Sequence, residues 1–181
     1  TGIPPPPVRA ETERKPLVLL VGDSMMMEGF GPVLQRTLRK RPDLEVVREG
    51  KYSTGLSRQD YFDWPAQLEK LVGKYNPDMV VICMGANDPQ DIIDENRKRH
   101  HADSESWKTI YRSRAERLLA VATAKGAKAV WVGLPVMGKE PYSTRVRRLS
   151  ELQKEACETY HAAFVDTVKV LADAQGNYTT F

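Results

Sequence analysis

Short apolar runs alternate with amphipathic segments along most of the chain. The runs at 17–21, 44–47, 79–84, 127–132 and 162–165 have the length of strands, and the first is continuously apolar, as in a strand buried on both faces. Helical spacing predicts helices at 29–40, 65–74, 104–125 and 142–160. Strands that alternate with helices form parallel sheets through right-handed crossovers. We therefore predict a three-layer α/β/α sandwich of the flavodoxin type with about five parallel strands.

Individual residues refine this pattern. In the helix at 29–40, Val33, Leu34, Thr37 and Leu38 share one side, which we expect to face the sheet. Pro65 suits the first turn of the helix at 65–74, and Gly126 suits the end of the helix at 104–125. The tryptophans at 64 and 131 are predicted in the core, although the first could also wall a cleft.

The chain divides into a short Pro-rich segment at 1–16 and one domain at 17–181. Pro4 to Pro7 and the charged residues after them cannot bury a core, so we interpret 1–16 as a linker or an irregular tail. Such a linker would suit a tether to a membrane through a segment that precedes it. The sequence itself shows no secretory signal and no apolar stretch of membrane-spanning length.

Charge and cysteine usage argue against two other kinds of site. The chain has 27 basic and 24 acidic residues, and its basic clusters lie in separate segments among acids. Nucleic-acid binding needs one continuous basic face, so we predict no nucleic-acid partner. Cys83 lies in an apolar strand and Cys157 on a predicted helix, which favours two buried free thiols over a disulfide or a metal motif.

Three of the predicted strands end in small polar turns that carry Ser24, Gly55 and Asn87. Ligands of open parallel sheets bind beyond the carboxyl ends of the strands, where these turns meet. There the Ser24 hydroxyl can act as a nucleophile, and the Gly55 N–H and the Asn87 amide can stabilise an oxyanion. Structural roles fit as well: an N-cap for Ser24, a turn with positive φ for Gly55 and an Asx turn for Asn87. For Asp88 we predict a structural carboxylate that fixes its loop.

These turns and the segments around them resemble the SGNH (GDSL-type) hydrolases, over residues 17–181. The matching motifs are Gly22-Asp23-Ser24, Ser53-Thr54-Gly55-Leu56, Phe62-Asp63-Trp64-Pro65, Gly85-Ala86-Asn87-Asp88-Pro89-Gln90 and Trp131-Val132-Gly133-Leu134-Pro135. Each motif is a weak signal alone, whereas their common order on consistent elements is specific. The likeness is greatest to a poorly characterised bacterial branch of the family.

The resemblance implies a serine esterase. Ser24 would be the nucleophile, and the oxyanion hole would consist of the Ser24 and Gly55 N–H groups and the Asn87 side chain. The substrate would be a small-molecule or glycan ester, such as an O-acetyl or short acyl group on a carbohydrate. The reaction would need no metal or organic cofactor. Together with the Pro-rich segment, the resemblance suggests a periplasmic or other extracytoplasmic location.

The sequence departs from this family in its last motif. The family places Asp-x-x-His after the fifth strand, where the histidine is the general base and the aspartate orients it. Here no histidine follows His161, which precedes that strand and reads as a helix-end residue. His100 and His101 lie in a charged segment that we predict as a solvated loop or helix start. We therefore expect that the parent protein continues through Asp-x-x-His and one more helix, which would cover the first and fifth strands.

Other functions remain open from the sequence. An acyltransferase would use the same residues, and a catalytically inactive domain of this fold would bind its ligand without turning it over. A nucleotide-binding flavodoxin-like module is disfavoured because the first turn lacks a Gly-x-Gly-x-x-Gly or P-loop pattern.

Overall fold

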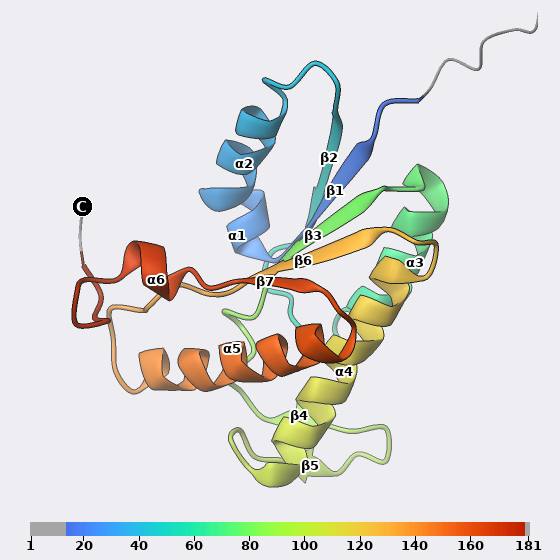
Figure 1. The fold of residues 1–181 in the computed structure, drawn as a ribbon. Helices are drawn as coiled ribbons and strands as arrows, with labels where there is room; N and C mark the ends of the chain where they lie inside the picture. The colour runs from blue at the N-terminus through green and yellow to red at the C-terminus, as the bar shows by residue number, and fades with distance from the viewer. Residues whose placement is uncertain (1–13, 180–181) are drawn as a thin grey trace, which may run out of the picture.

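A computed structural model describes residues 14–179, and its central feature is a five-stranded parallel sheet (Figure 1). The strands are β1 (Leu17–Gly22), β2 (Glu45–Gly50), β3 (Met79–Cys83), β6 (Lys128–Val132) and β7 (Ala163–Val165). Their order is β2-β1-β3-β6-β7, which is the flavodoxin order. The predicted fold class is confirmed.

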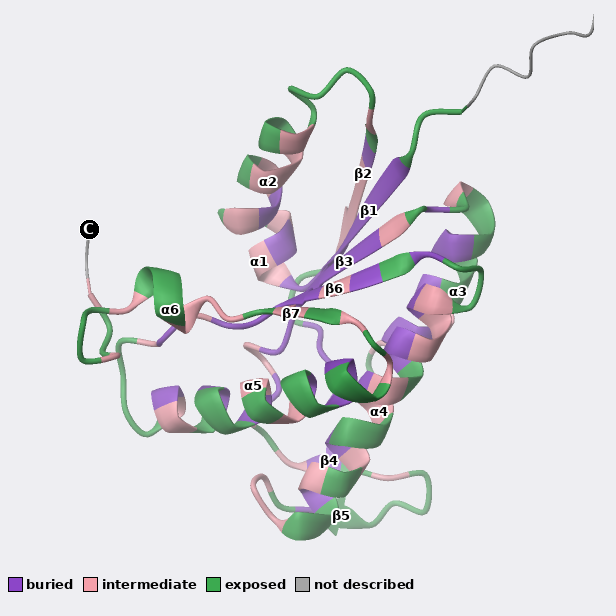
Figure 2. Ribbon diagram, in the orientation of Figure 1, coloured by how far each residue is buried: buried purple, intermediate pink, exposed green. Residues whose placement is uncertain are grey.

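Helices flank both faces of this sheet (Figure 1). They are α1 (Ser24–Met27), α2 (Phe30–Leu38), α3 (Trp64–Tyr75), α4 (Glu105–Thr123), α5 (Tyr142–Thr159) and α6 (Val168–Leu171). The apolar residues of α3, α4 and α5 form the larger core with one face of the sheet, and α1 and α2 form a smaller core with the other. Figure 2 shows the burial concentrated in the central strands and on the inner sides of the helices. Trp64 and Trp131 are both fully buried in the larger core, as predicted.

Local chemistry explains where these helices begin. Asp63 accepts a hydrogen bond from the Ala66 N–H and caps α3, with Pro65 in the first turn. Ser104 caps α4 in the same way through the Trp107 N–H. Gly126, at a φ of +83°, follows the end of α4, as its position in the sequence predicts.

The structure differs from the sequence prediction at three places. Val33 is 51% exposed, and α2 packs instead through Phe30, Leu34 and Leu38, because its inward stripe is rotated from the predicted one. A short separate helix, α1, begins at Ser24, ahead of the helix predicted from residue 29. A two-stranded antiparallel hairpin, β4 (Ile92–Ile93) with β5 (Arg99–His100), lies at the foot of α4, in the segment predicted as a solvated loop (Figure 1).

The face of the sheet that carries α1 and α2 is incompletely covered by residues 14–179. Between α2 and α6 lies an apolar groove of about 820 Å³ that is lined by side chains of β1, β3, β6 and both helices. No helix in the described part of the chain is both long and apolar enough to cross a bilayer.

The predicted linker meets the domain at its last residues. The Arg14 guanidinium donates two hydrogen bonds of 2.8 Å to the Asp78 carboxylate, and Pro16 O accepts from the Glu45 N–H. Residues 1–13 lie outside the described residues, so their role as a linker stays a prediction.

Candidate active site

The three turns predicted to form the site follow three adjacent strands. Gly22, at the end of β1, pairs with Gly50 at the end of β2 and with Cys83 at the end of β3. Ser24 lies two residues beyond Gly22, while Gly55 and Asn87 follow the neighbouring strands. Because adjacent strands are about 4.8 Å apart, the structure brings all three turns to one edge of the sheet, with the β1 turn in the middle.

The β1 turn is held by a buried carboxylate. Asp23 Oδ1 accepts from the Met25 N–H at 2.9 Å as the N-cap of α1, and Oδ2 accepts from the Gly85 N–H at 3.0 Å. Burial raises the pKa of Asp23, and these N–H groups oppose the rise. Asp23 therefore occupies the N-cap that the sequence analysis considered for Ser24. The half-buried Ser24 is the first residue of the helix, so its N–H is one of the donors that the helix leaves unsatisfied.

The β2 turn is held by a second buried carboxylate, that of Asp88. Its oxygens accept from the Leu56 N–H at 3.0 Å, the Ser57 N–H at 2.8 Å and the Tyr111 hydroxyl at 3.0 Å. Burial raises the pKa of Asp88, whereas the Leu56 and Ser57 N–H groups lower it. The structural role predicted for this residue is thus seen directly.

Gly55 is required here for close approach. Its φ is not positive, in contrast to the turn role considered for it; the positive φ of this turn, 58°, belongs to Ser53. A Cβ on Gly55 would lie 2.2 Å from Asp88 Oδ1, so a side chain would displace the carboxylate. No acceptor for the Gly55 N–H is recorded within residues 14–179, which leaves it free for a ligand.

Asn87 also contacts the β2 turn. Its Nδ2 donates to Thr54 O at 2.9 Å and keeps a second hydrogen free. The C=O and N–H of a trans peptide point in opposite directions, so the Gly55 N–H points away from Asn87 in this arrangement. In this arrangement the two donors therefore do not converge on one oxygen. Catalytic hydrogen bonds are often misaligned in this way in ligand-free sites and form on binding.

Three residues of this region escaped the sequence analysis. Tyr111 and Gln153 are buried and bonded to each other, and they reach Asp88 and Met84 O respectively. Arg114, on α4, donates to Leu56 O and Ser57 O. The apolar stripe of each helix predicts its inner face, but no local signal shows which polar residue of the helix reaches a loop 23 to 69 positions away.

Other predicted elements lie around the same edge. The turn after β6 begins with Gly133, whose N–H donates to Val165 O at 2.9 Å. The Tyr142 hydroxyl donates to Ala86 O, beside Asn87, and burial raises the pKa of Tyr142. On the helix that Tyr142 begins, Arg145 Nε lies 3.8 Å from Asp103 Oδ2.

None of the three histidines has a recorded contact with Ser24. His161 lies in the turn after α5, in a cavity with Met79 and Lys128 at the opposite, amino end of the sheet. The prediction of a solvated His100 is wrong: its side chain is 7% exposed and lies 2.9 Å from both Asp94 Oδ2 and Ser106 Oγ. A charged segment can hide such a residue when the charges around it serve as its partners.

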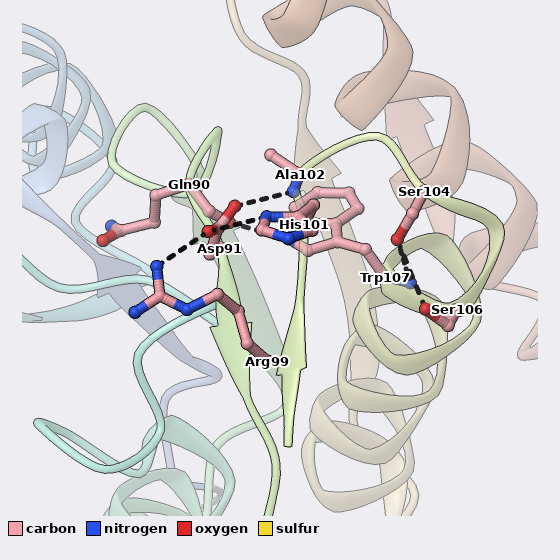
Figure 3. Close-up of polar contacts among 8 residues, drawn as sticks. All are labelled: Gln90, Asp91, Arg99, His101, Ala102, Ser104, Ser106 and Trp107. Carbon is pink, nitrogen blue, oxygen red and sulfur yellow. Dashed lines mark hydrogen bonds and ion pairs between the residues drawn. The ribbon is translucent and has the colours of Figure 1, made fainter. Parts of the chain in front are cut away.

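His101 belongs to an exposed polar cluster beside the hairpin (Figure 3). Asp91 accepts from the Ala102 N–H at 2.9 Å, and its carboxylate lies 3.2 Å from His101 Nδ1 and 3.4 Å from Arg99 Nη1. His101 therefore has a carboxylate partner but is not joined to the Ser24 turn.

The remaining chemistry of the described residues is limited. Cys83 and Cys157 are buried free thiols, as predicted, and burial raises the pKa of each to about 12. Within residues 14–179 no group of three or more His, Cys, Asp or Glu side chains is placed to hold a metal ion.

Solved structures of esterases share this fold. A member of the lipolytic protein G-D-S-L family from Veillonella parvula superposes with a TM-score of 0.62 at 13% identity, over 88% of this chain and 81% of that one. The acetylxylan esterase Axe2 from Geobacillus stearothermophilus gives 0.60 at 18% identity, over 91% and 87%. The psychrotrophic esterase EstA from Pseudoalteromonas sp. gives 0.57 at 15%, over 91% and 87%. At these identities the likeness establishes the fold alone.

The chain belongs to DUF459, a family described as proteins of unknown function, whose model matches residues 17–181. The search of curated proteins found no match.

Proposed function

We propose that this chain is the core of a serine esterase in which Ser24 attacks the ester carbonyl. The Ser24 and Gly55 N–H groups and the Asn87 amide would stabilise the oxyanion that forms. The observation that carries the proposal is the meeting of these three turns, tied by the bonds from Gly85 N to Asp23 and from Asn87 Nδ2 to Thr54 O. The free N–H groups of Ser24 and Gly55 each lie in a turn that a buried carboxylate fixes, that of Asp23 and that of Asp88 respectively.

The substrate class that we propose is a small-molecule or glycan ester with an acetyl or short acyl group. The acetylxylan esterase among the structural neighbours supports this choice, as do the sequence motifs. An extracytoplasmic location is proposed on the Pro-rich segment and the same motifs.

Release of p-nitrophenol from p-nitrophenyl acetate by this chain and by S24A tests the proposal. The assay is run at neutral pH over a range of imidazole concentrations. None of the three histidines within residues 14–179 contacts Ser24, so added imidazole takes the place of the general base. We expect little turnover without imidazole and a Ser24-dependent rate with it. Hydrolysis by imidazole itself is equal in both samples and cancels in their difference.

Each outcome is decisive. Equal rates for the two chains at every imidazole concentration would overturn the esterase proposal and favour a ligand-binding domain. Rapid Ser24-dependent turnover without imidazole would support an esterase and show that a base reaches Ser24. With acetylated xylan and a free sugar, acetate in solution supports hydrolysis, whereas acetate on the sugar identifies a transferase.

A further inference from the structure

We propose that Arg114 is a positioning residue that fixes the direction of the Gly55 N–H. The inference rests on the proposed function, since it concerns one donor of the proposed oxyanion hole. Arg114 lies on α4, contacts the loop after β2, and would act through that loop without touching substrate.

The contacts form a clamp on the two residues that follow Gly55. Arg114 Nη1 donates to Leu56 O at 2.7 Å and to Ser57 O at 3.1 Å. The Asp88 carboxylate accepts from the N–H groups of the same two residues, at 3.0 and 2.8 Å. All four backbone polar groups of Leu56 and Ser57 are therefore held, two by a cation and two by a carboxylate.

This clamp leaves the Gly55 backbone little freedom. Glycine has the widest conformational range of any residue, so an unrestrained Gly55 would orient its N–H poorly. The Leu56 and Ser57 peptides that follow it are clamped, and this restraint remains when the Asn87 amide leaves the Thr54 carbonyl. Donors help catalysis most when they are fixed before the charge develops, and a misplacement of about 1 Å can cost about 100-fold in rate.

Arg114 suits this task because one nitrogen makes both bonds. The side chain is half-buried, and its partners in the loop are neutral carbonyls. The clamp therefore needs a hydrogen-bond donor at this position. A lysine ammonium can make the same two contacts, whereas a methionine keeps the stem and removes the donor. Arg114 borders a surface cavity of about 420 Å³, and Arg117, one turn further along α4, borders the same cavity. Arg117 is exposed and makes no hydrogen bond or ion pair within residues 14–179, so it serves as the control.

The experiment compares R114M, R114K and the control R117M in two measurements. The first is the ¹H–¹⁵N shift and hydrogen exchange of the Gly55 amide. The second is the Ser24-dependent kcat and KM for p-nitrophenyl acetate with imidazole. We expect R114M to move and expose the Gly55 amide and to lower kcat about tenfold or more with KM nearly unchanged. R114K and R117M should stay within about threefold of the unsubstituted chain.

The two proposals fail separately. If the unsubstituted chain shows no Ser24-dependent turnover, the proposed function fails, and the Gly55 amide alone decides whether Arg114 sets its orientation. An unchanged Gly55 amide in a folded R114M overturns the clamp. A shifted amide with full kcat overturns the role of Arg114 in positioning the oxyanion hole. If R114M does not fold, R114K decides, because loss of kcat in a folded R114K would show that a donor at this place is not sufficient.

Discussion

Replacing Gly55 by alanine tests how closely the loop after β2 approaches Asp88. The new Cβ would lie 2.2 Å from Oδ1 and 2.6 Å from Cγ of a fully buried carboxylate. Ordinary contacts begin at about 3.4 Å, so the loop and the carboxylate must separate by about 1.2 Å. The buried side chain cannot swing into solvent to relieve the contact.

This separation sets the magnitude of the effect. It would lengthen the bonds from the Leu56 and Ser57 N–H groups, now 3.0 and 2.8 Å, to about 4 Å, which is too long for a hydrogen bond. Taking about 1.5 kcal/mol for each lost bond, we expect G55A to lower the free energy of unfolding by about 3 kcal/mol. For a chain of this size the midpoint of thermal unfolding should then fall by about 6–12 °C.

Urea denaturation measures the change, with G73A as the matched control. Gly73 lies in α3 and is exposed, and beyond the helix's own backbone an added Cβ would meet no atom within 4 Å. Alanine there should raise the stability by about 0.5–1 kcal/mol, because glycine is a poor helix former. A G55A chain within about 0.5 kcal/mol of the unsubstituted one would refute the close approach, and with it the account of why glycine is needed.

Three further substitutions or labelling experiments probe other parts of the structure. Trp64 Nε1 donates to Thr54 Oγ1 at 3.0 Å, whereas Trp131 Nε1 has no partner within residues 14–179. In urea denaturation, W64F should therefore lower the free energy of unfolding by about 1 kcal/mol more than W131F, and equal losses of stability would contradict this. Because burial raises the pKa of Cys83 and Cys157 to about 12, a thiol reagent at pH 8 should label neither in the native chain and both in denaturant, and rapid native labelling would show that they are accessible. H100A should destabilise by about 1–3 kcal/mol through the loss of a buried hydrogen-bonded ring, whereas H101A at an exposed site should change stability by less than about 0.5 kcal/mol; the reverse order would contradict the burial of His100.

The sequence predicts the sheet well because its strands are marked by strong local patterns. β1 and β3 are continuous apolar runs, and their burial needs no knowledge of the partner strands. Val33 was misplaced because α2 is partly exposed, so several of its apolar residues compete for the inner face. The β4–β5 hairpin has two residues per strand, which is too short for a periodic signal.

The candidate site was predictable only where its residues follow strand ends. Ser24, Gly55 and Asn87 could be placed together because the carboxyl ends of parallel strands share one edge of a sheet. Arg114 and Tyr111 could not, since their positions on α4 carry information about the helix face and none about the loop that they reach. The orientation of the Asn87 amide toward Thr54 likewise depends on the packed loops.

The two buried carboxylates link the three turns to one another through the β3 turn. Asp23, in the β1 turn, accepts from Gly85 in the β3 turn, and Asp88, in the β3 turn, accepts from Leu56 and Ser57 in the β2 turn. Each carboxylate therefore sits beside a candidate functional residue, Ser24 or Asn87, but bonds across to the next turn. Because these bonds link β1 to β3 and β3 to β2, loosening the β3 turn releases both of its neighbours. Loss of the Asp88 carboxylate should therefore release the Gly55 loop from the Asn87 turn, whereas loss of the Asp23 carboxylate should release the Ser24 turn from it, although neither carboxylate takes part in the chemistry proposed for these residues.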